Sequence, residues 1–351
     1  MQTTTLRPLV RTTGPFTSVY FEDTHDTEDA GKQLELRWRD LRDRLSAQHA
    51  PAESLAALEK AVLNGAPPVG RSGRGLIAAG DSVLLDERLH EPPAEPLTRV
   101  SGLPYVLPLT RYAEPRLKYV VASVDQINAS VAAYDEYGRK RADDEVSGRD
   151  HPVHQVRGGG VGQYEMREHT EETIRRNVAE IAEDVTKLAD RTGAELVVLA
   201  GEIQGRRAVL DALPKHVGQI THEVTHEDVA GELAAAEKQR RLDEVLERFR
   251  GALGREDGLA GQGLEAVTNA LLEGNVETLL VSDPGEETVW TGESPARVAV
   301  SEPELRALGE TEAHENRADE ALPAAAIVVG ADLVHVDSEL QEGFGAILRH
   351  R

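Results

Sequence analysis

Two histidines and a glutamate stand at a spacing that also occurs in zinc proteases. The run His222-Glu-Val-Thr-His226 matches the pattern H-E-x-x-H, in which the histidines hold Zn²⁺ and the glutamate activates a metal-bound water. That chemistry requires a helix, because helical spacing places residues four apart on one face. Residues 217–221 instead predict a strand, which would separate the histidines by about 13 Å if it continued. We interpret the motif as a polar hinge and predict no metal site, with a zinc hydrolase as the alternative.

A glycine-rich loop, Arg157-Gly-Gly-Gly-Val-Gly-Gln163, is the more unusual segment. Glycine adopts backbone conformations that side chains forbid, and its N–H groups are left exposed to a ligand. A helix that starts behind such a loop can receive an anion. No Lys-Ser or Lys-Thr follows and the spacing departs from G-x-G-x-x-G, so no nucleotide cofactor is predicted. The alternative to an anion-binding role for residues 157–163 is a flexible surface loop. A second glycine-rich basic segment, Gly70-Arg-Ser-Gly-Arg-Gly75, is interpreted as a turn.

The composition narrows the class of protein. The chain has 351 residues, with 39 Lys and Arg against 62 Asp and Glu, a net charge of −23, and no cysteine. An acidic surface disfavours general binding of DNA or anionic membranes, since both need positive charge. Without cysteine there are no disulfides, thiolate metal sites or cysteine nucleophiles. The N-terminal residues lack the apolar core of a signal peptide, and the longest apolar stretch, near 322–329, is too short to span a bilayer. We expect a cytoplasmic protein.

Residues 1–115 form the first predicted domain. An apolar run over 16–21 predicts a strand, and one apolar stripe predicts a helix through Leu34, Trp38, Leu41 and Leu45. The arginines of that helix lie mostly off the stripe and favour a solvated face with local ion pairs, or alternatively an RNA-facing surface; they are Arg37, Arg39, Arg42 and Arg44. A helix over 53–63 and a hairpin around Gly80-Asp81 complete the domain.

Two further domains are predicted, 116–226 and 227–351. In the middle domain, strand–helix–strand order implies a parallel α/β sheet, with a long helix that starts near Thr170 and ends at Gly193. The expected strands of this domain are 119–125, 130–134, 195–200 and 217–221, and its second helix is 206–213. The third domain is also α/β, with expected helices 229–253 and 263–274 and strands 277–282, 324–329 and 343–349.

The third domain resembles the C-terminal domain of archaeal and eukaryotic class-1 peptide release factors and of Pelota. The run Gly263-Leu-Glu-Ala-Val matches their Gly-Leu-Glu-x-Val helix, and Val276-Glu-Thr-Leu-Leu-Val281 matches the strand that follows it. The ending Gly343-Phe-Gly-Ala-Ile-Leu-Arg349 is similar to their Gly-x-x-Ala-Ile-Leu-Arg. The resemblance implies an α/β/α domain of the L7Ae-like type.

The resemblance extends over nearly the full chain. The glycine-rich loop and the helix with Arg175-Arg-Asn-Val-Ala-Glu180 are similar to the Arg-Gly-Gly-Gln loop of release factors and the Arg-x-Asn-Tyr-Val helix behind it. The segments Val19-Tyr-Phe-Glu-Asp-Thr-His-Asp26 and Trp38-Arg-Asp-Leu-Arg42 resemble the bacterial branch of this superfamily, which includes the ribosome hibernation factor Balon.

Two departures qualify what the resemblance implies. The hydrolytic Gly-Gly-Gln of release factors is here Val161-Gly-Gln163, and the first domain has no Asn-Ile-Lys-Ser, the motif that reads stop codons. The resemblance therefore implies a factor that occupies the ribosomal A site during dormancy or stress, and not a termination factor. Its first domain would approach the decoding centre, its loop the peptidyl transferase centre and its third domain a translational GTPase, by resemblance elongation factor Tu with GDP.

On this hypothesis no residue is catalytic. The loop would contact ribosomal RNA through backbone, arginine, amide and aromatic groups; its residues are Arg157, Gly158, Gly159, Gly160, Gly162, Gln163 and Tyr164. Because the chain is acidic, RNA contacts must be confined to local patches such as Arg139-Lys-Arg141, or a protein partner must contribute. The alternative is an enzyme, a peptidyl-tRNA hydrolase that rescues stalled ribosomes, in which Gln163 positions the water.

Overall fold

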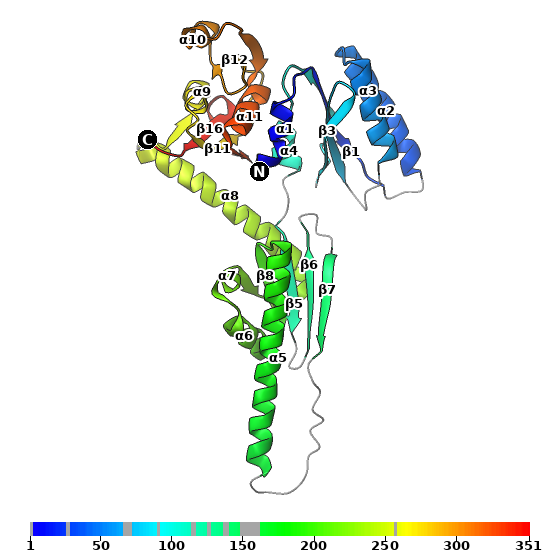
Figure 1. Cartoon of the computed structure of the whole chain (residues 1–351), viewed down its shortest axis with the longest axis vertical. Coiled ribbons are helices and arrows are strands. Elements are labelled where there is room, and N and C mark those ends of the chain that lie inside the picture. The colour runs from blue at the N-terminus through cyan, green and yellow to red at the C-terminus, as the bar shows by residue number, and fades with distance from the viewer. Residues whose placement is uncertain are drawn as a thin grey trace. The chain divides into compact units, whose positions relative to one another are not determined.

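The computed structural model describes residues 3–25, 29–65, 72–89, 92–113, 117–124, 128–135, 140–147, 162–255 and 258–351. The chain folds into two compact units (Figure 1). One unit combines Met1–Glu114 with Glu244–Arg351, and the other is Pro115–Asp243. Both mix sheets and helices, so the predicted α/β class is confirmed. The division into three domains at residues 115 and 226 stays a prediction.

The N-terminal part of the first unit is an antiparallel sheet under two helices. Its strand order is β3-β2-β1-β4, with β1 (Phe16–Glu22) paired to β2 (Gly73–Ala79) and to β4 (Leu97–Ser101), and with β3 (Ser82–Leu89) outside β2. The helices α2 (Ala30–Ala47) and α3 (Ala52–Asn64) follow one another in sequence. All four residues of the predicted stripe are buried, and they share a core with the sheet. The predicted hairpin at Gly80-Asp81 is also confirmed.

Side chains alternate between the two faces of this sheet. Val19 and Phe21 face α2 and α3, whereas Phe16 and Tyr20 face a second core. That second core is shared by two segments far apart in the chain. It contains Leu9 of α1 (Arg7–Val10), Leu109 of α4 (Leu107–Tyr112) and apolar residues of the C-terminal part. The N-terminal sheet therefore lies between its own two helices and the C-terminal part of the unit.

The C-terminal part contains two sheets. The larger one has the order β10-β16-β11-β15, in which β11 (Val276–Val281) and β15 (Asp332–His335) are parallel. The strand β16 (Phe344–Leu348) pairs antiparallel with β11, and β10 (Ala260–Gln262) pairs antiparallel with β16. The smaller sheet consists of β12 (Thr288–Thr291), β13 (Val298–Ala299) and β14 (His314–Arg317). The helices here are α9 (Leu264–Leu272), α10 (Glu302–Ala307) and α11 (Ala318–Val329), and the 3-10 turn η3 spans Gln341–Gly343.

One predicted strand of this part is wrong. Residues 324–329 lie in α11, which begins beside Asp319 and Glu320 and ends before Gly330, a glycine with φ of 71°. Ala321, Leu322 and every residue from 324 to 327 are fully buried, so the helix is apolar on all sides and has no amphipathic period. A short apolar run of this kind cannot be assigned to strand or helix by periodicity alone.

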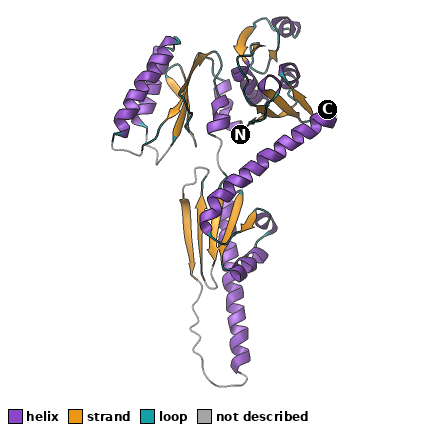
Figure 2. Ribbon diagram, turned by 180° about the vertical axis from the view of Figure 1, so that it is seen from behind, coloured by secondary structure: helices purple, strands orange, loops and turns teal. Residues whose placement is uncertain are grey.

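The second unit is a five-stranded sheet with helices on both faces (Figure 2). In the order β7-β6-β5-β8-β9, the parallel strands are β5 (Tyr119–Val124), β8 (Leu196–Gly201) and β9 (Thr221–Glu223). The antiparallel strands β6 (Asn128–Tyr134) and β7 (Lys140–Ser147) extend it. The helices α5 (Gly162–Thr192) and α6 (Ile203–Ala212) pack on one face through Ile181, Val185 and Val209. Ala230 and Ala234 of α8 (Ala230–Arg255) pack on the other.

Three sequence predictions for this unit are corrected. The expected strand over 217–221 is α7 (Lys215–Gly218) followed by β9, so the strand starts later. The strand β7 was not expected, because its Lys, Arg, Asp and Glu residues hide the apolar alternation, a composition that suits an edge strand. The long helix α5 begins at Gly162 and not near Thr170. It does end at Gly193 as predicted, with φ of 64° at that glycine. Among the described helices of the chain, none is long and apolar enough to cross a membrane.

Candidate functional site

The predicted loop lies at the start of α5. Arg157, Gly158, Gly159 and Gly160 lie outside the described residues, while the backbone of Gly162, Gln163 and Tyr164 forms the first turn of the helix. Gly162 and Gln163, which the sequence predicts in the loop, therefore lie in the helix instead. The role of these residues in contacting RNA stays a prediction.

The C-terminal part of α5 is anchored in the core. Asn177, Ile181, Val185 and Leu188 are buried, and the last three pack with strand residues in the core of the sheet. Before Asn177 the described side chains are exposed, including Ile174 with 47% of its surface open to solvent. From Gly162 to Asn177 the helix runs for about 22 Å at 1.5 Å per residue. Figures 1 and 2 show this half of α5 extending beyond the ends of the strands. The sheet thus holds the C-terminal half of the helix, and the backbone of its first turn, from Gly162, lies away from the core.

The basic patch predicted at residues 139–141 is neutralised where it is described. Arg139 lies outside the described residues. Lys140 pairs with Asp143 at 2.8 Å, and Arg141 pairs with the buried Asp135 at 2.6 Å. The hydrogen bond from Lys140 lowers the pKa of Asp143. In the same unit Arg175, Arg176 and Arg207 are exposed on α5 and α6. On α5, Arg175 and Arg176 lie next to Asn177, where the anchored half begins.

The H-E-x-x-H motif does not form a helix. His222 and Glu223 belong to β9, and His226 is extended before a 3-10 turn. Glu223 pairs with Arg206, whose Nε lies 3.4 Å from the carboxylate. The two histidines are therefore not one helical turn apart, which the zinc-protease chemistry requires. Over the described ranges, no group of three His, Asp or Glu side chains is arranged to hold a metal ion.

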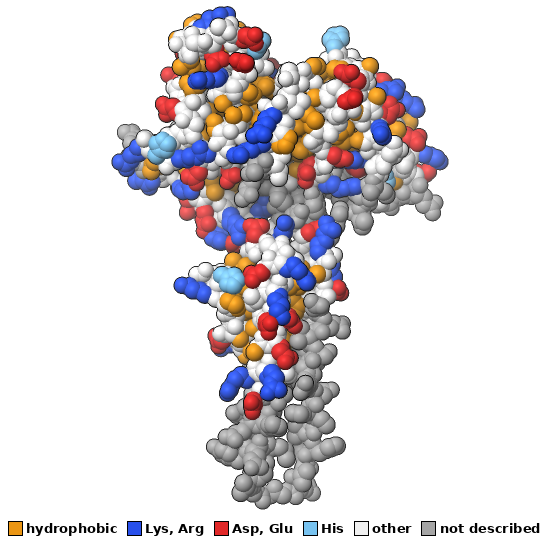
Figure 3. Space-filling view, in the orientation of Figure 1, with side chains coloured by type: hydrophobic (Ala, Val, Ile, Leu, Met, Phe, Trp, Pro, Cys, Tyr) orange, Lys and Arg blue, Asp and Glu red, His pale blue; other side chains and the backbone are white. Residues whose placement is uncertain are grey.

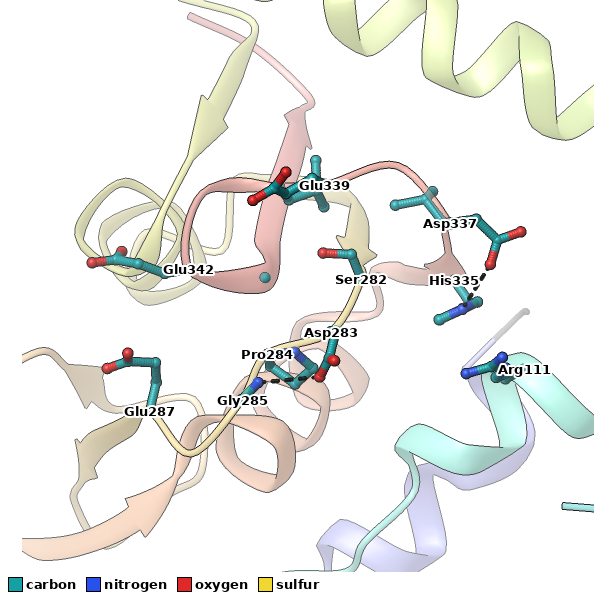
Figure 4. Close-up of a pocket in the computed structure, with 13 residues that line it drawn as sticks. Arg111, Ser282, Asp283, Pro284, Gly285, Glu287, His335, Asp337, Glu339 and Glu342 are labelled. Atoms are coloured by element: carbon teal, nitrogen blue, oxygen red, sulfur yellow. Dashed lines mark hydrogen bonds and ion pairs between the residues drawn. The ribbon is translucent and has the colours of Figure 1, made fainter. Parts of the chain in front are cut away.

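A pocket that sequence analysis missed lies at the carboxyl ends of β11 and β15 (Figure 4). It has a volume of about 560 Å³ and is formed by the loops after these two parallel strands, by η3 and by Arg111 of α4. Parallel α/β sheets commonly bind ligands at this edge. The signal was absent because β15 was not predicted, so only one of the two loops could be placed at a strand end.

Carboxylates dominate the lining of the pocket. They are Asp283, Glu287, Asp337, Glu339 and Glu342, against the cationic Arg111 and the imidazole of His335, which lies 3.5 Å from Asp337. Glu342 is committed to structure, because it accepts a hydrogen bond of 2.7 Å from the N–H of Leu264 at the start of α9. This excess of carboxylates is suited to a cationic group.

Two ionic clusters are buried within the first unit. Arg99 of β4 reaches Glu320 at 2.8 Å and Asp319 at 3.5 Å, and its guanidinium lies 4.4 Å from the ring centre of Tyr105. Burial raises the pKa of Glu320, and burial with the nearby Asp319 raises the pKa of Tyr105 to about 12. The second cluster is centred on Asp23, which lies 3.6 Å from Arg88. Burial raises the pKa of Asp23, although the nearby arginines act to lower it. Both clusters are internal, so we assign them to stability and not to binding.

Comparison with known proteins identifies the class. Residues 118–259 match the model of "Bacterial archaeo-eukaryotic release factor family 2". Over 366 aligned residues, which cover all of this chain and 97% of the relative, the sequence is 40% identical to an uncharacterized protein of Mycobacterium tuberculosis strain H37Rv. The chain therefore belongs to the bacterial archaeo-eukaryotic release factors, and within them to family 2.

Solved structures of release factors and Pelota are more distant. The archaeal translation termination factor aRF1 is 15% identical with a TM-score of 0.24, over 98% of this chain and 96% of that one. Pelota of Archaeoglobus fulgidus is 12% identical with a TM-score of 0.32, over 99% and 92%. Archaeal Pelota in a model of its ribosome-bound form with ABCE1 is 15% identical with a TM-score of 0.41, over 99% and 93%. Similarities at this level support no argument about function.

Proposed function

We propose that the protein is a ribosome-binding translation factor that occupies the A site. Its glycine-rich segment, residues 157–164, would reach toward the peptidyl transferase centre. The supporting observation is α5, whose anchored half packs on the sheet while its other half runs for about 22 Å from Asn177, the first buried residue described, to Gly162. A projection of this length suits entry into a narrow RNA-lined site, and family membership supplies the translational context.

The proposed role is hibernation or a stress response, with ribosomal RNA as the main ligand and elongation factor Tu with GDP as a partner. The net charges of two segments favour RNA as the ligand of one and a protein as the partner of the other. Residues 115–243 hold 18 Lys and Arg against 24 Asp and Glu, whereas residues 244–351 hold 8 against 22. The more acidic segment is repelled by RNA and is suited to a protein partner with a basic surface.

Co-sedimentation with intact bacterial ribosomes tests this proposal. We expect the purified protein to pellet with ribosomes at low and at physiological salt, with or without elongation factor Tu and GDP. Replacing residues 158–163 by a Ser-Gly linker of equal length should weaken binding without unfolding the chain, because these residues precede the anchored half of α5. Absence of binding at either salt, with the GTPase present, would contradict the proposal.

A peptide-release assay separates this factor from a hydrolase. The protein is added to ribosomes that carry labelled peptidyl-tRNA, and the released peptide is measured for the native protein and for Gln163→Ala. If the protein only occupies the A site, neither the native protein nor Gln163→Ala releases peptide, and both bind the ribosome. Release by the native protein that is lost in Gln163→Ala would instead establish the enzyme.

A further inference from the structure

Among the helices that the structure describes, α2 has the largest net positive charge. Within its bounds α2 has five Lys and Arg against three Asp and Glu, a net charge of +2 in a chain of −23. Its basic residues are Lys32, Arg37, Arg39, Arg42 and Arg44. Lys32, Arg39, Arg42 and Arg44 are exposed on the surface that faces solvent. Arg37 is half-buried and donates hydrogen bonds to Glu22, so it is not part of that surface. In Figure 3, Lys and Arg side chains are prominent over α2 and α3, with Asp and Glu between them.

The ion pairs of these residues are weak enough to be exchanged for a stronger ligand. Arg44 pairs with Asp40 at 2.9 Å, with side-chain exposures of 48% and 58%, and Arg42 pairs with Glu59 at 3.8 Å across to α3. Lys32 pairs with Asp29, and both side chains are more than two-thirds exposed. Exposed pairs of this kind contribute little, because water and salt screen them. A phosphate can therefore compete for these groups, and Arg39 is exposed beside them.

The position of α2 in the unit also separates it from the acidic segment. One face of the N-terminal sheet packs on α2 and α3, and the other packs on the C-terminal part. Residues 244–351 carry a net charge of −14 from 8 basic and 22 acidic side chains. The sheet thus lies between the positive helix and the negative segment. An RNA surface that attracts α2 would repel the opposite side of the unit, which sets one orientation.

From this polarity we infer that the outer face of α2 is the surface by which the N-terminal part contacts the phosphate backbone of ribosomal RNA. The inference rests on the proposed function and goes beyond it by naming the element. Arginine is suited to this role because its planar guanidinium can donate two parallel hydrogen bonds to one phosphate. Leu36, which is 61% exposed on the same helix, adds an apolar contact for ribose at the centre of the face.

The test compares two double variants that lose the same charge. Arg39→Ala with Arg44→Ala removes two arginines from α2. The matched control, Arg248→Ala with Arg306→Ala, removes two arginines from the acidic segment; Arg248 pairs with Glu277 at 2.7 Å and Arg306 with Glu302 at 2.6 Å, and all four side chains are partly exposed. Ribosome affinity is measured at several salt concentrations. For the α2 variant we expect Kd at low salt to rise by about tenfold and the salt slope to fall by about 2. The control should change neither by more than about twofold.

Two further measurements make the outcome decisive. Arg39→Lys with Arg44→Lys keeps the charge and should keep most of the affinity and the salt slope. Hydroxyl-radical footprinting of small-subunit ribosomal RNA should show backbone protection by the native protein that the alanine variant loses. Equal affinity of the α2 variant and the control would overturn the inference, as would weaker binding with unchanged RNA protection, which would assign α2 to a ribosomal protein. If the native protein does not bind ribosomes at all, the proposed function fails first.

Discussion

Arg99 joins the N-terminal part to the C-terminal part through a buried ion-pair cluster. It supplies the cation that faces Glu320 and Asp319, and these carboxylates are only 2% and 5% exposed. Asp319 also pairs with Arg317 and would keep that cation if Arg99 were removed. Glu320 would therefore be affected more than Asp319. A buried carboxylate without its cation is costly, because it has given up water and gained nothing in return.

Replacement of Arg99 by alanine should therefore destabilise the first unit strongly. We expect a loss of about 3–5 kcal/mol in the free energy of unfolding, measured by urea denaturation at pH 7. The control Arg44→Ala removes an exposed pair and should cost no more than about 1 kcal/mol. Similar losses for both variants would show that the buried cluster has no special role.

Asp23 provides a pH-dependent prediction. Burial raises its pKa in the folded chain above the ordinary value of 3.8, although Arg74, His25, Arg88 and Arg37 act in the opposite direction. The folded state thus binds this proton more tightly than the unfolded state does. The stabilisation from this group is fully present below pH 3.8 and is lost as the pH rises through its folded pKa.

Asp23→Asn should remove that dependence. Because asparagine does not titrate, the unfolding free energy of the native protein should decline relative to that of the variant as the pH rises from about 3.8 toward neutrality. Urea denaturation of both proteins over this range measures the difference. A difference that is constant with pH, or that grows in favour of the native protein, would contradict the assignment.

At the scale of elements, α5 combines an anchored half and a projecting half. Ile181 is 2% exposed in the core of the sheet, whereas Ile174, two turns earlier, is 47% exposed. We expect Ile181→Ala to lower the free energy of unfolding by about 2–5 kcal/mol, since it leaves a cavity. Ile174→Ala should change it by less than about 0.5 kcal/mol. Chemical denaturation of the two variants compares them directly, and equal losses would mean that the projecting half is packed.

The same helix shows what sequence could predict and why the rest was missed. The stripe through Ile181, Val185 and Leu188 predicted the anchored half, because burial on one face leaves a helical period. In the projecting half, the side chains that the structure describes before Asn177 are exposed and leave no such period, and the helix begins at Gly162, eight residues before the predicted start. The helix α11 was missed because its apolar residues are buried on every side, so the sequence has no helical period of apolar and polar residues. The pocket beside β15 was missed for a related reason, because a strand of four residues leaves too short a pattern.

At the scale of the whole molecule, charge and family membership support the same account. The chain belongs to the bacterial archaeo-eukaryotic release factors, its helix α5 begins at Gly162 and extends beyond the strands (Figure 1), and its positive charge is concentrated away from residues 244–351. A protein that is acidic overall can then bind RNA through limited surfaces while its acidic segment remains available for a protein partner.

Competition for the A site tests this account most directly. Ribosomes with an occupied P site are mixed with labelled aminoacyl-tRNA and increasing amounts of the protein, and both bound species are counted after sedimentation. If the protein occupies the A site, each bound copy excludes one aminoacyl-tRNA, and replacing residues 158–163 by a Ser-Gly linker weakens this exclusion. Simultaneous full binding of the protein and the aminoacyl-tRNA would contradict the account, because the two would then occupy different sites.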